Sequence, residues 1–231
     1  MYKIKYIKMK KLIVYLMFLM PLTIVSGQNY ETVKGGIGLL AGVNYQNLFG
    51  KDFFGDKLNG KGIIGFHAGV NVQIPIASEF FFQPGLLFST KGSKIDDTDA
   101  SSLINLSYIE LPLNMVYKSN LGNGFIMLGF GPYAGYALKG KVTYDGLDGR
   151  IVSDVKFKNS IETGDPISQT YLKALDFGGN IFAGYEMSNG IFLQVNTQIG
   201  MVNISPNDNQ NPNSEVSIKN IGFGLSLGYR L

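Results

Sequence analysis

The sequence predicts an all-β protein, an eight-stranded antiparallel up-and-down transmembrane β-barrel. Three observations lead to this prediction: long apolar/polar alternation, glycine within the alternating runs, and connections that are short and long in turn. Alternation with a period of two residues is typical of a strand whose two faces meet different surroundings. The clearest run is 217–231, where one face carries Ile221, Phe223, Leu225, Leu227 and Tyr229 and the other carries Gly222, Gly224, Ser226, Gly228 and Arg230.

Eight such runs can be marked along the chain. A tilted transmembrane β-strand needs roughly 9–11 residues, and each run is at least that long. The glycine content is high, at 30 of 231 residues, and the inward positions of a narrow barrel leave little room for side chains. The predicted strands are 36–47, 62–74, 79–91, 103–118, 124–139, 171–187, 191–203 and 217–231.

The chemistry of the two faces favours a membrane barrel over a soluble lipocalin-like barrel. The polar face is mostly Gly, Asn, Gln and Ser, which suits a packed interior better than a water-exposed surface rich in Lys and Glu. Aromatic residues gather at the ends of the apolar face, as in the aromatic girdles at membrane interfaces. We expect Tyr45, Phe88 and Tyr136 at one rim and Phe80, Tyr117, Tyr185 and Tyr229 at the other.

The connections predict the orientation. Segments 74–79, 119–124 and 188–190 are short, whereas 48–61, 92–102, 140–170 and 204–216 are long and polar. Bacterial outer-membrane barrels have short periplasmic turns and long extracellular loops, so both termini are expected in the periplasm. Loop 140–170 is the longest, and we expect it to extend the barrel as a hairpin through 142–144 and 151–157.

The first 27 residues have the order of a secretory signal peptide: a lysine-rich start, an apolar run over 12–25, and small residues before Gln28. We therefore expect cleavage near Gly27 and Gln28, leaving 28–231 as one barrel domain in the cell outer membrane. The segment 1–27 holds five of the 20 basic residues and none of the 17 acidic ones, so the mature chain has 15 basic and 17 acidic residues, net −2. That balance gives no basic patch for nucleic acid.

The composition leaves little for catalysis or metal binding. The chain has no Cys and a single His, so we predict no catalytic, cofactor-binding or metal-binding residues, no cofactor, and no enzyme activity. A barrel hydrolase would place His67 beside Ser89 and an acid, but no spacing motif marks such a set. Asp96, Asp97 and Asp99 lack the pattern of a calcium loop, and a solvated loop explains them.

Several charged residues fall on the polar, inward face, where a charge must be paired or hydrated. We interpret them as a structural ion-pair plug rather than an ion path. They are Glu110, Lys118, Lys139, Asp176, Glu186 and Arg230. Pro84 and Pro112 lie inside predicted strands and cannot donate a ladder hydrogen bond, so we expect bulges or local kinks there.

Five segments carry a resemblance to a known family. They are 36–45, 82–92 (FQPGLLFSTKG), 108–113 (YIELPL), 129–133 (GFGPY) and 222–229 (GFGLSLGY). Over residues 28–231 the chain resembles the PorT-like outer-membrane β-barrel proteins, which are abundant in Bacteroidetes. The resemblance implies a small outer-membrane barrel, brings no catalytic residues, and links one family member to type IX secretion.

The leading expectation is a monomeric, structural or interaction barrel embedded in the lipid bilayer, whose long loops present a binding surface for a protein partner or a surface ligand. Two alternatives stay open. One is an accessory component of a type IX-like secretion system, and the other is a lipid-modifying barrel enzyme.

Overall fold

The computed structural model describes residues 35–231 except 54, 59, 97–99, 148 and 213. The predicted signal peptide, its cleavage site and residues 28–34 lie outside the described residues, as do Asp97 and Asp99. No helix in the described part of the chain is long and apolar enough to cross a membrane.

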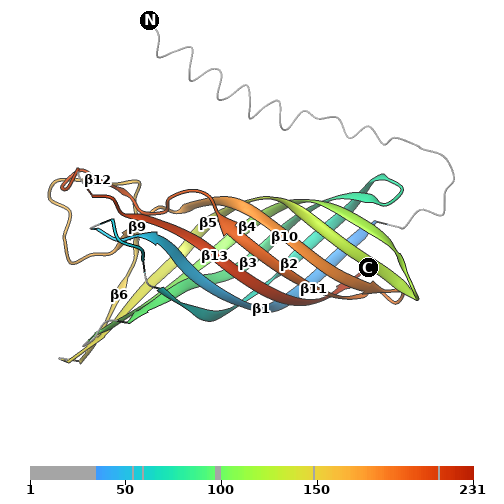
Figure 1. The fold of residues 1–231 in the computed structure, drawn as a ribbon, viewed down its shortest axis with the longest axis horizontal. Helices are drawn as coiled ribbons and strands as arrows, with labels where there is room; N and C mark the ends of the chain where they lie inside the picture. Colours follow the sequence, from blue (N-terminus) through green and yellow to red (C-terminus); the bar gives the residue numbers. More distant parts are fainter. Residues whose placement is uncertain (1–34, 54, 59, 97–99, 148, 213) are drawn as a thin grey trace, which may run out of the picture. The chain divides into compact units, whose positions relative to one another are not determined.

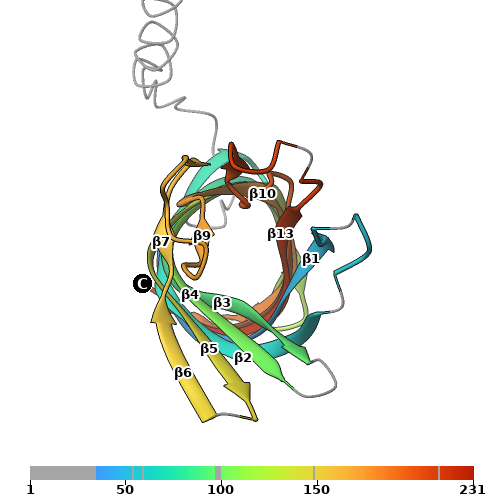
Figure 2. The ribbon, with the colours of Figure 1, turned by 90° about the vertical axis from the view of Figure 1, so that its left-hand side faces the viewer.

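All the secondary-structure elements of the described residues are β-strands. Eight strands close into a ring in the order β1-β2-β3-β4-β5-β10-β11-β13, and every neighbouring pair is antiparallel (Figures 1 and 2). The ring strands are β1 (Gly36–Lys51), β2 (Gly60–Ala77), β3 (Phe80–Asp96), β4 (Ser101–Leu121), β5 (Gly124–Gly146), β10 (Leu175–Met187), β11 (Ile191–Gly200) and β13 (Ser217–Arg230). The eight-stranded barrel predicted from the alternation is thereby confirmed.

Five shorter strands lie in the long connections. They are β6 (Gly149–Asp154), β7 (Lys156–Phe157), β8 (Ser160–Ile161), β9 (Tyr171–Leu172) and β12 (Asn207–Asp208). All of them occur at one end of the barrel, which we call the loop end; the other end, with the three short connections, is the turn end (Figure 1).

Except in the upper part of β5, the two faces of the ring strands point where the alternation predicts. In β1, Val43 and Tyr45 are exposed on the outside, while Asn44 and Gln46 are buried inside. On β5 the outward apolar positions run from Ile126 to Tyr136, and ten residues at about 3.3 Å each and a tilt of about 40° rise about 25 Å. That height matches the apolar band of an outer-membrane barrel.

Inward glycines leave space for inward aromatic rings. A Cβ added to Gly129 would lie 2.2 Å from the ring of Phe182, and one added to Gly228 would lie 2.2 Å from the ring of Phe192. Phe182 and Phe192 are both buried, with Phe81 and Met127, in an apolar cluster inside the barrel. Steric room therefore accounts for these two glycines within strands.

The bulges predicted at the two prolines are wrong. Pro84 pairs with Leu113 and Pro112 pairs with Tyr133, and the β3–β4 and β4–β5 registers continue unchanged on either side of them. Some ladder pairs are missing beside each proline, but no residue is inserted. Gly85 opposite Pro112 makes this fit possible, since an added Cβ would lie 3.1 Å from the proline ring.

A bulge occurs instead in the upper part of β5, and it overturns one inward assignment. Ala137 pairs with Tyr108 and Lys139 pairs with Ser107, so Leu138 is an extra residue in β5. The side chains of Leu138 and Lys139 are both exposed. Lys139, which simple alternation places inside, is therefore on the outer surface.

The first five ring strands reach further toward the loop end than predicted, and two later strands are shorter than predicted. The predicted sixth strand at 171–187 is split, because Tyr171 and Leu172 pair with β7 and the barrel strand begins only at Leu175. The predicted seventh strand ends at Gly200, three residues earlier than expected.

Loop 140–170 does extend the barrel as a hairpin, but a shorter one. β5 continues past the ring and pairs with β6 from Lys141–Asp154 to Gly146–Gly149. Residues 156–157, predicted to continue this hairpin, instead form β7 and pair with β9. Figure 2 shows the hairpin projecting away from the ring, while β7 and β9 lie at its mouth.

Candidate functional site

Two regions could carry function: the barrel interior and the loop end. The interior holds two separate groups of buried charges. The first, the upper cluster, consists of Lys91, Glu110 and Asp176. The Lys91 ammonium lies 2.7 Å from Glu110 and 3.2 Å from Asp176, and all three side chains are at most 1% exposed.

Neighbouring side chains complete the upper cluster. The Tyr133 hydroxyl and the Asn220 amide donate to Asp176 Oδ2 at 3.0 and 2.9 Å. The amide of Gln198 donates to Glu110 at 3.0 Å. Lys91 also lies over the Tyr133 ring, 4.5 Å from its centroid. Two carboxylates share one cation here, and neutral donors bond to one oxygen of each, whereas Asp176 Oδ1 accepts no hydrogen bond from the described residues.

The second group, the lower cluster, lies near the turn end and consists of Lys118, Glu186 and Arg230. Glu186 bridges the two cations, with Lys118 at 2.6 Å and Arg230 at 2.8 Å. Arg230 donates a further hydrogen bond to Asn71 at 3.0 Å and lies over the ring of Phe192. Here one carboxylate serves two cations, the reverse of the upper cluster.

Five of the six charged residues assigned to the interior are thus buried and paired there, and Lys139 is the exception. Sequence reasoning missed Lys91 and Tyr133. Both lie on the inward parity of their strands, but Lys91 was the last residue of its predicted strand and Tyr133 was grouped with the glycines around it. Extending the third strand by a few residues would have shown that Lys91 faces inward.

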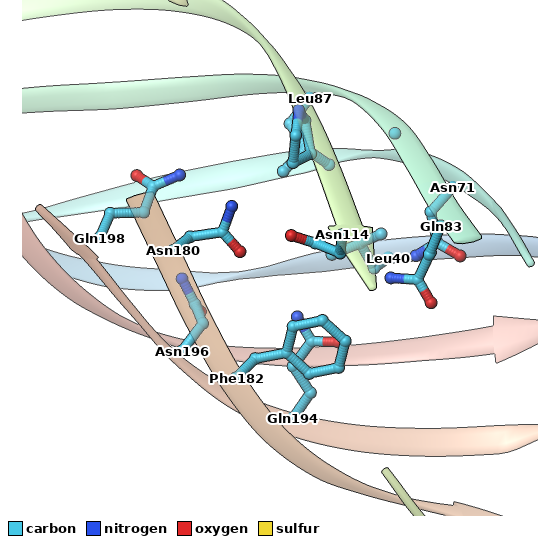
Figure 3. Close-up of a pocket in the computed structure, with 12 residues that line it drawn as sticks. Leu40, Asn71, Gln83, Leu87, Asn114, Asn180, Phe182, Gln194, Asn196 and Gln198 are labelled. Carbon is cyan, nitrogen blue, oxygen red and sulfur yellow. The ribbon is translucent and has the colours of Figure 1, made fainter. Parts of the chain in front are cut away.

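Between the two clusters lies a cavity of about 40 Å³, large enough for a few water molecules (Figure 3). Side-chain amides dominate its wall. The lining includes Asn71, Gln83, Asn114, Asn180, Gln194, Asn196 and Gln198. Among the described residues, the side-chain oxygens of Asn114 and Asn196 accept no hydrogen bond. The chamber suits ordered water, and its size excludes larger solutes.

His67 is buried in the interior and does not form a hydrolase-like set with Ser89. Its Nε2 lies 2.7 Å from the hydroxyl of Ser226, whereas Ser89 accepts a hydrogen bond from Asn44. Ser226 is fully buried. Asp96 pairs with Lys61 and Lys94. In the described part of the chain, no three His, Asp or Glu residues are grouped so that they could hold a metal ion.

The loop end holds a second buried apolar cluster. Leu106, Tyr108 and Val142 from the barrel strands pack against loop residues such as Val155 and Ile204. Loop backbone bonds hold this arrangement: Val155 donates to Gly140, and Ile204 donates to Ile218. Loop residues and barrel strands therefore pack together at this end, and we call this packed layer the apolar cover.

Beyond this cover the hairpin exposes apolar side chains. Ile151 is 67% exposed and Val152 is 56% exposed, and Leu147 at the tip is more exposed still. β6 ends the sheet order, so in the described residues no strand pairs with its outer edge.

A closed antiparallel ring with a polar, ion-paired interior and an apolar outer belt defines the class of transmembrane β-barrels. Residues 34–206 match the family model described as "Outer membrane protein beta-barrel domain". The chain belongs to this family and is an outer-membrane β-barrel protein. This match does not show membership of the PorT-like group.

Similar solved structures include proteins from Yersinia pestis, Neisseria and Escherichia coli. The attachment invasion locus protein Ail of Yersinia pestis, solved with the heparin analogue sucrose octasulfate, is 12% identical with a TM-score of 0.41, and the match covers 86% of this chain and 99% of Ail. Neisserial surface protein A is 9% identical with a TM-score of 0.44, and the match covers 86% and 99%. The Escherichia coli outer membrane protease OmpT is 10% identical with a TM-score of 0.29, covering 89% and 99%. No curated protein sequence matches the chain.

Proposed function

We propose that this protein is a non-enzymatic interaction barrel whose loop end faces outward from the cell and presents a surface for a protein partner. The observation that carries this proposal is the β5–β6 hairpin. It projects past the barrel, leaves a strand edge unpaired among the described residues, and exposes Leu147, Ile151 and Val152. An unpaired, apolar strand edge is a template for pairing with an extended segment of another protein.

The filled interior supports the same proposal, because it argues against transport through the barrel. The upper cluster, the lower cluster, the interior apolar cluster around Phe81 and the apolar cover at the loop end occupy much of the lumen, with the cavity of about 40 Å³ between the two charged clusters. A narrow eight-stranded barrel filled in this way does not serve as an open pore. Interaction at the surface is then the role that the geometry favours.

Site-specific photo-crosslinking in intact cells tests the proposal. A crosslinker at Val152 on the hairpin is compared with one at Asn123, an exposed residue of a short turn at the opposite end. Discrete protein adducts from position 152 and none from position 123 would support the hairpin as the interaction surface.

The same experiment separates the alternatives. Adducts from position 123 alone would favour an accessory role in secretion, with partners at the turn end. Adducts from neither position, in a strain where the protein is folded and abundant, would contradict the proposal.

A further inference from the structure

The bulge in β5 has a chemical consequence at the membrane boundary. By turning Lys139 outward, it places an ammonium group on the lipid-facing side, one residue beyond the exposed Leu138 and three beyond Tyr136. Tyr136 and Leu138 are 55% and 54% exposed and belong to the apolar belt. Lys139 therefore stands at the first position above this belt, at the depth of the lipid headgroups.

Two further lysines share this face. Lys141 follows Lys139 by two residues and is exposed on the same side of β5. Lys141 of β5 pairs with Asp154 of the neighbouring strand β6. One residue further along, the Val155 amide donates to the Gly140 carbonyl at 2.9 Å. Continued by one residue, that register brings Lys156 level with Lys139, at the point where the chain leaves β5 and pairs with β9. We call Lys139, Lys141 and Lys156 the lysine patch.

Two acids lie near the patch. Asp154 lies across from Lys141, and Asp165, which lies 2.5 Å from Lys158, also interacts electrostatically with Lys156. Among the described residues, no carboxylate forms an ion pair with any lysine of the patch, although Lys51, Lys61 and Lys94 at the same end each have one.

We propose that the lysine patch binds a phosphate group of a membrane lipid in the leaflet at the loop end. An anion bound by Lys139 and Lys156 would neutralise their two positive charges. The position just above the apolar belt selects a lipid headgroup over a soluble anion, because the acyl chains of that lipid would lie against Tyr136 and Leu138. Basic side chains at this depth attract anionic lipids.

Native mass spectrometry of the detergent-folded chain tests the proposal with diphosphorylated lipid A as the probe. Lys139→Gln/Lys156→Gln is compared with wild type, and Lys51→Gln, an exposed lysine at the same end, is the matched control. Each basic residue near an anionic surface strengthens binding about fivefold, so the double variant should bind the lipid roughly 20-fold more weakly. The control should bind as wild type does, and dephosphorylated lipid A should bind the wild type weakly.

Several results would overturn the proposal. One is that the double variant binds lipid A as tightly as wild type does. Another is that Lys51→Gln weakens binding as much as the double variant does. A third is that wild type binds dephosphorylated and diphosphorylated lipid A equally tightly. Inorganic pyrophosphate bound as tightly as the lipid would also overturn it, by showing a soluble anion as the ligand. Because a pair of substitutions could impair folding, Lys156→Gln alone is measured as well, and an approximately fivefold loss is expected.

Discussion

The lumen and the loop end of this barrel are stabilised by opposite kinds of residue. Inside the ring, charged side chains are buried in two clusters separated by a chamber of amides, and each charge has a partner of opposite sign. At the loop end the buried cluster is apolar, made of aliphatic residues and Tyr108, whereas ion pairs such as Lys51–Glu215 lie on the surface. Removing one member of a buried ion pair leaves an unpaired buried charge and costs much of the stability. Truncating an apolar side chain costs stability roughly in proportion to the volume removed.

The two charged clusters also differ from each other. In the upper cluster one lysine is shared by two carboxylates, and in the lower cluster one carboxylate is shared by two cations. Removing the shared member should therefore have a larger effect than removing either of the others, because it leaves two like charges buried together.

The largest effect is expected for Lys91→Met. This change leaves Glu110 and Asp176 without their cation in a site that is about 1% exposed or less. We expect a loss of about 3–5 kcal/mol in the free energy of unfolding. Urea unfolding in phosphatidylcholine vesicles measures it, with Lys61→Met, which removes an exposed ion pair, as the control. Equal stability of the two variants would show that the upper cluster does not hold the barrel together.

A slightly smaller loss is expected for Glu186→Gln, because the neutral amide keeps part of the hydrogen bonding while Lys118 and Arg230 lose their counter-ion. We expect about 2–3 kcal/mol in the same unfolding assay. Adding Lys118→Met should recover part of this loss, since it removes one of the two unpaired cations. Strictly additive losses would mean that Lys118 and Glu186 are not coupled.

At the loop end, Ile204→Ala should act locally. Ile204 is fully buried in the apolar cluster, and its truncation removes packing from the loops rather than from the ring. We expect trypsin to cleave the folded chain near Lys156 and Lys173 about tenfold faster, with a much smaller change in global unfolding. Ile167→Ala, at a residue that is 93% exposed, is the control and should cleave as wild type does.

The smallest effect concerns the surface pair Lys158–Asp165. Hydrogen bonding by Lys158 holds the pKa of the Asp165 carboxyl below its usual value. The pair therefore stabilises the loop fully above the ordinary aspartate pKa of about 4, and this contribution disappears as the pH falls through the lowered value. Carboxyl NMR titration should show a low midpoint for Asp165 that rises in Lys158→Gln. An unchanged midpoint would show that Lys158 is not the cause.

The sequence predicted the lumen far better than the loop end, for a physical reason. Side-chain alternation is fixed by the strand backbone, so residues such as Asp176 and Glu186 could be assigned to the interior from parity alone. The packing of Val155 against Ile204 joins segments about fifty residues apart, and no local pattern encodes it. Neither does any periodic signal show that β7 pairs with β9 instead of extending the hairpin.

The bulge at Leu138 shows how parity fails. A single inserted residue reverses the faces of everything beyond it, and so Lys139 was assigned to the wrong side. The sequence did contain a local signal. If the small residue Gly140 faces the interior, then its neighbours Lys139 and Lys141 both face outward. The prolines gave the opposite error: Pro84 and Pro112 suggested bulges, but a facing glycine and missing ladder bonds accommodate proline without any change of register.

The most direct test of a closed membrane barrel with an outward loop end combines gel migration with surface proteolysis. The detergent-folded mature chain is run unheated and boiled, and trypsin is added to intact cells. We predict a heat-dependent shift in migration and cleavage confined to the loop end, first at Arg150 in the exposed hairpin. A single band at both temperatures, with cleavage throughout the chain, would contradict the membrane barrel; a shift without any cleavage at the loop end would contradict its orientation.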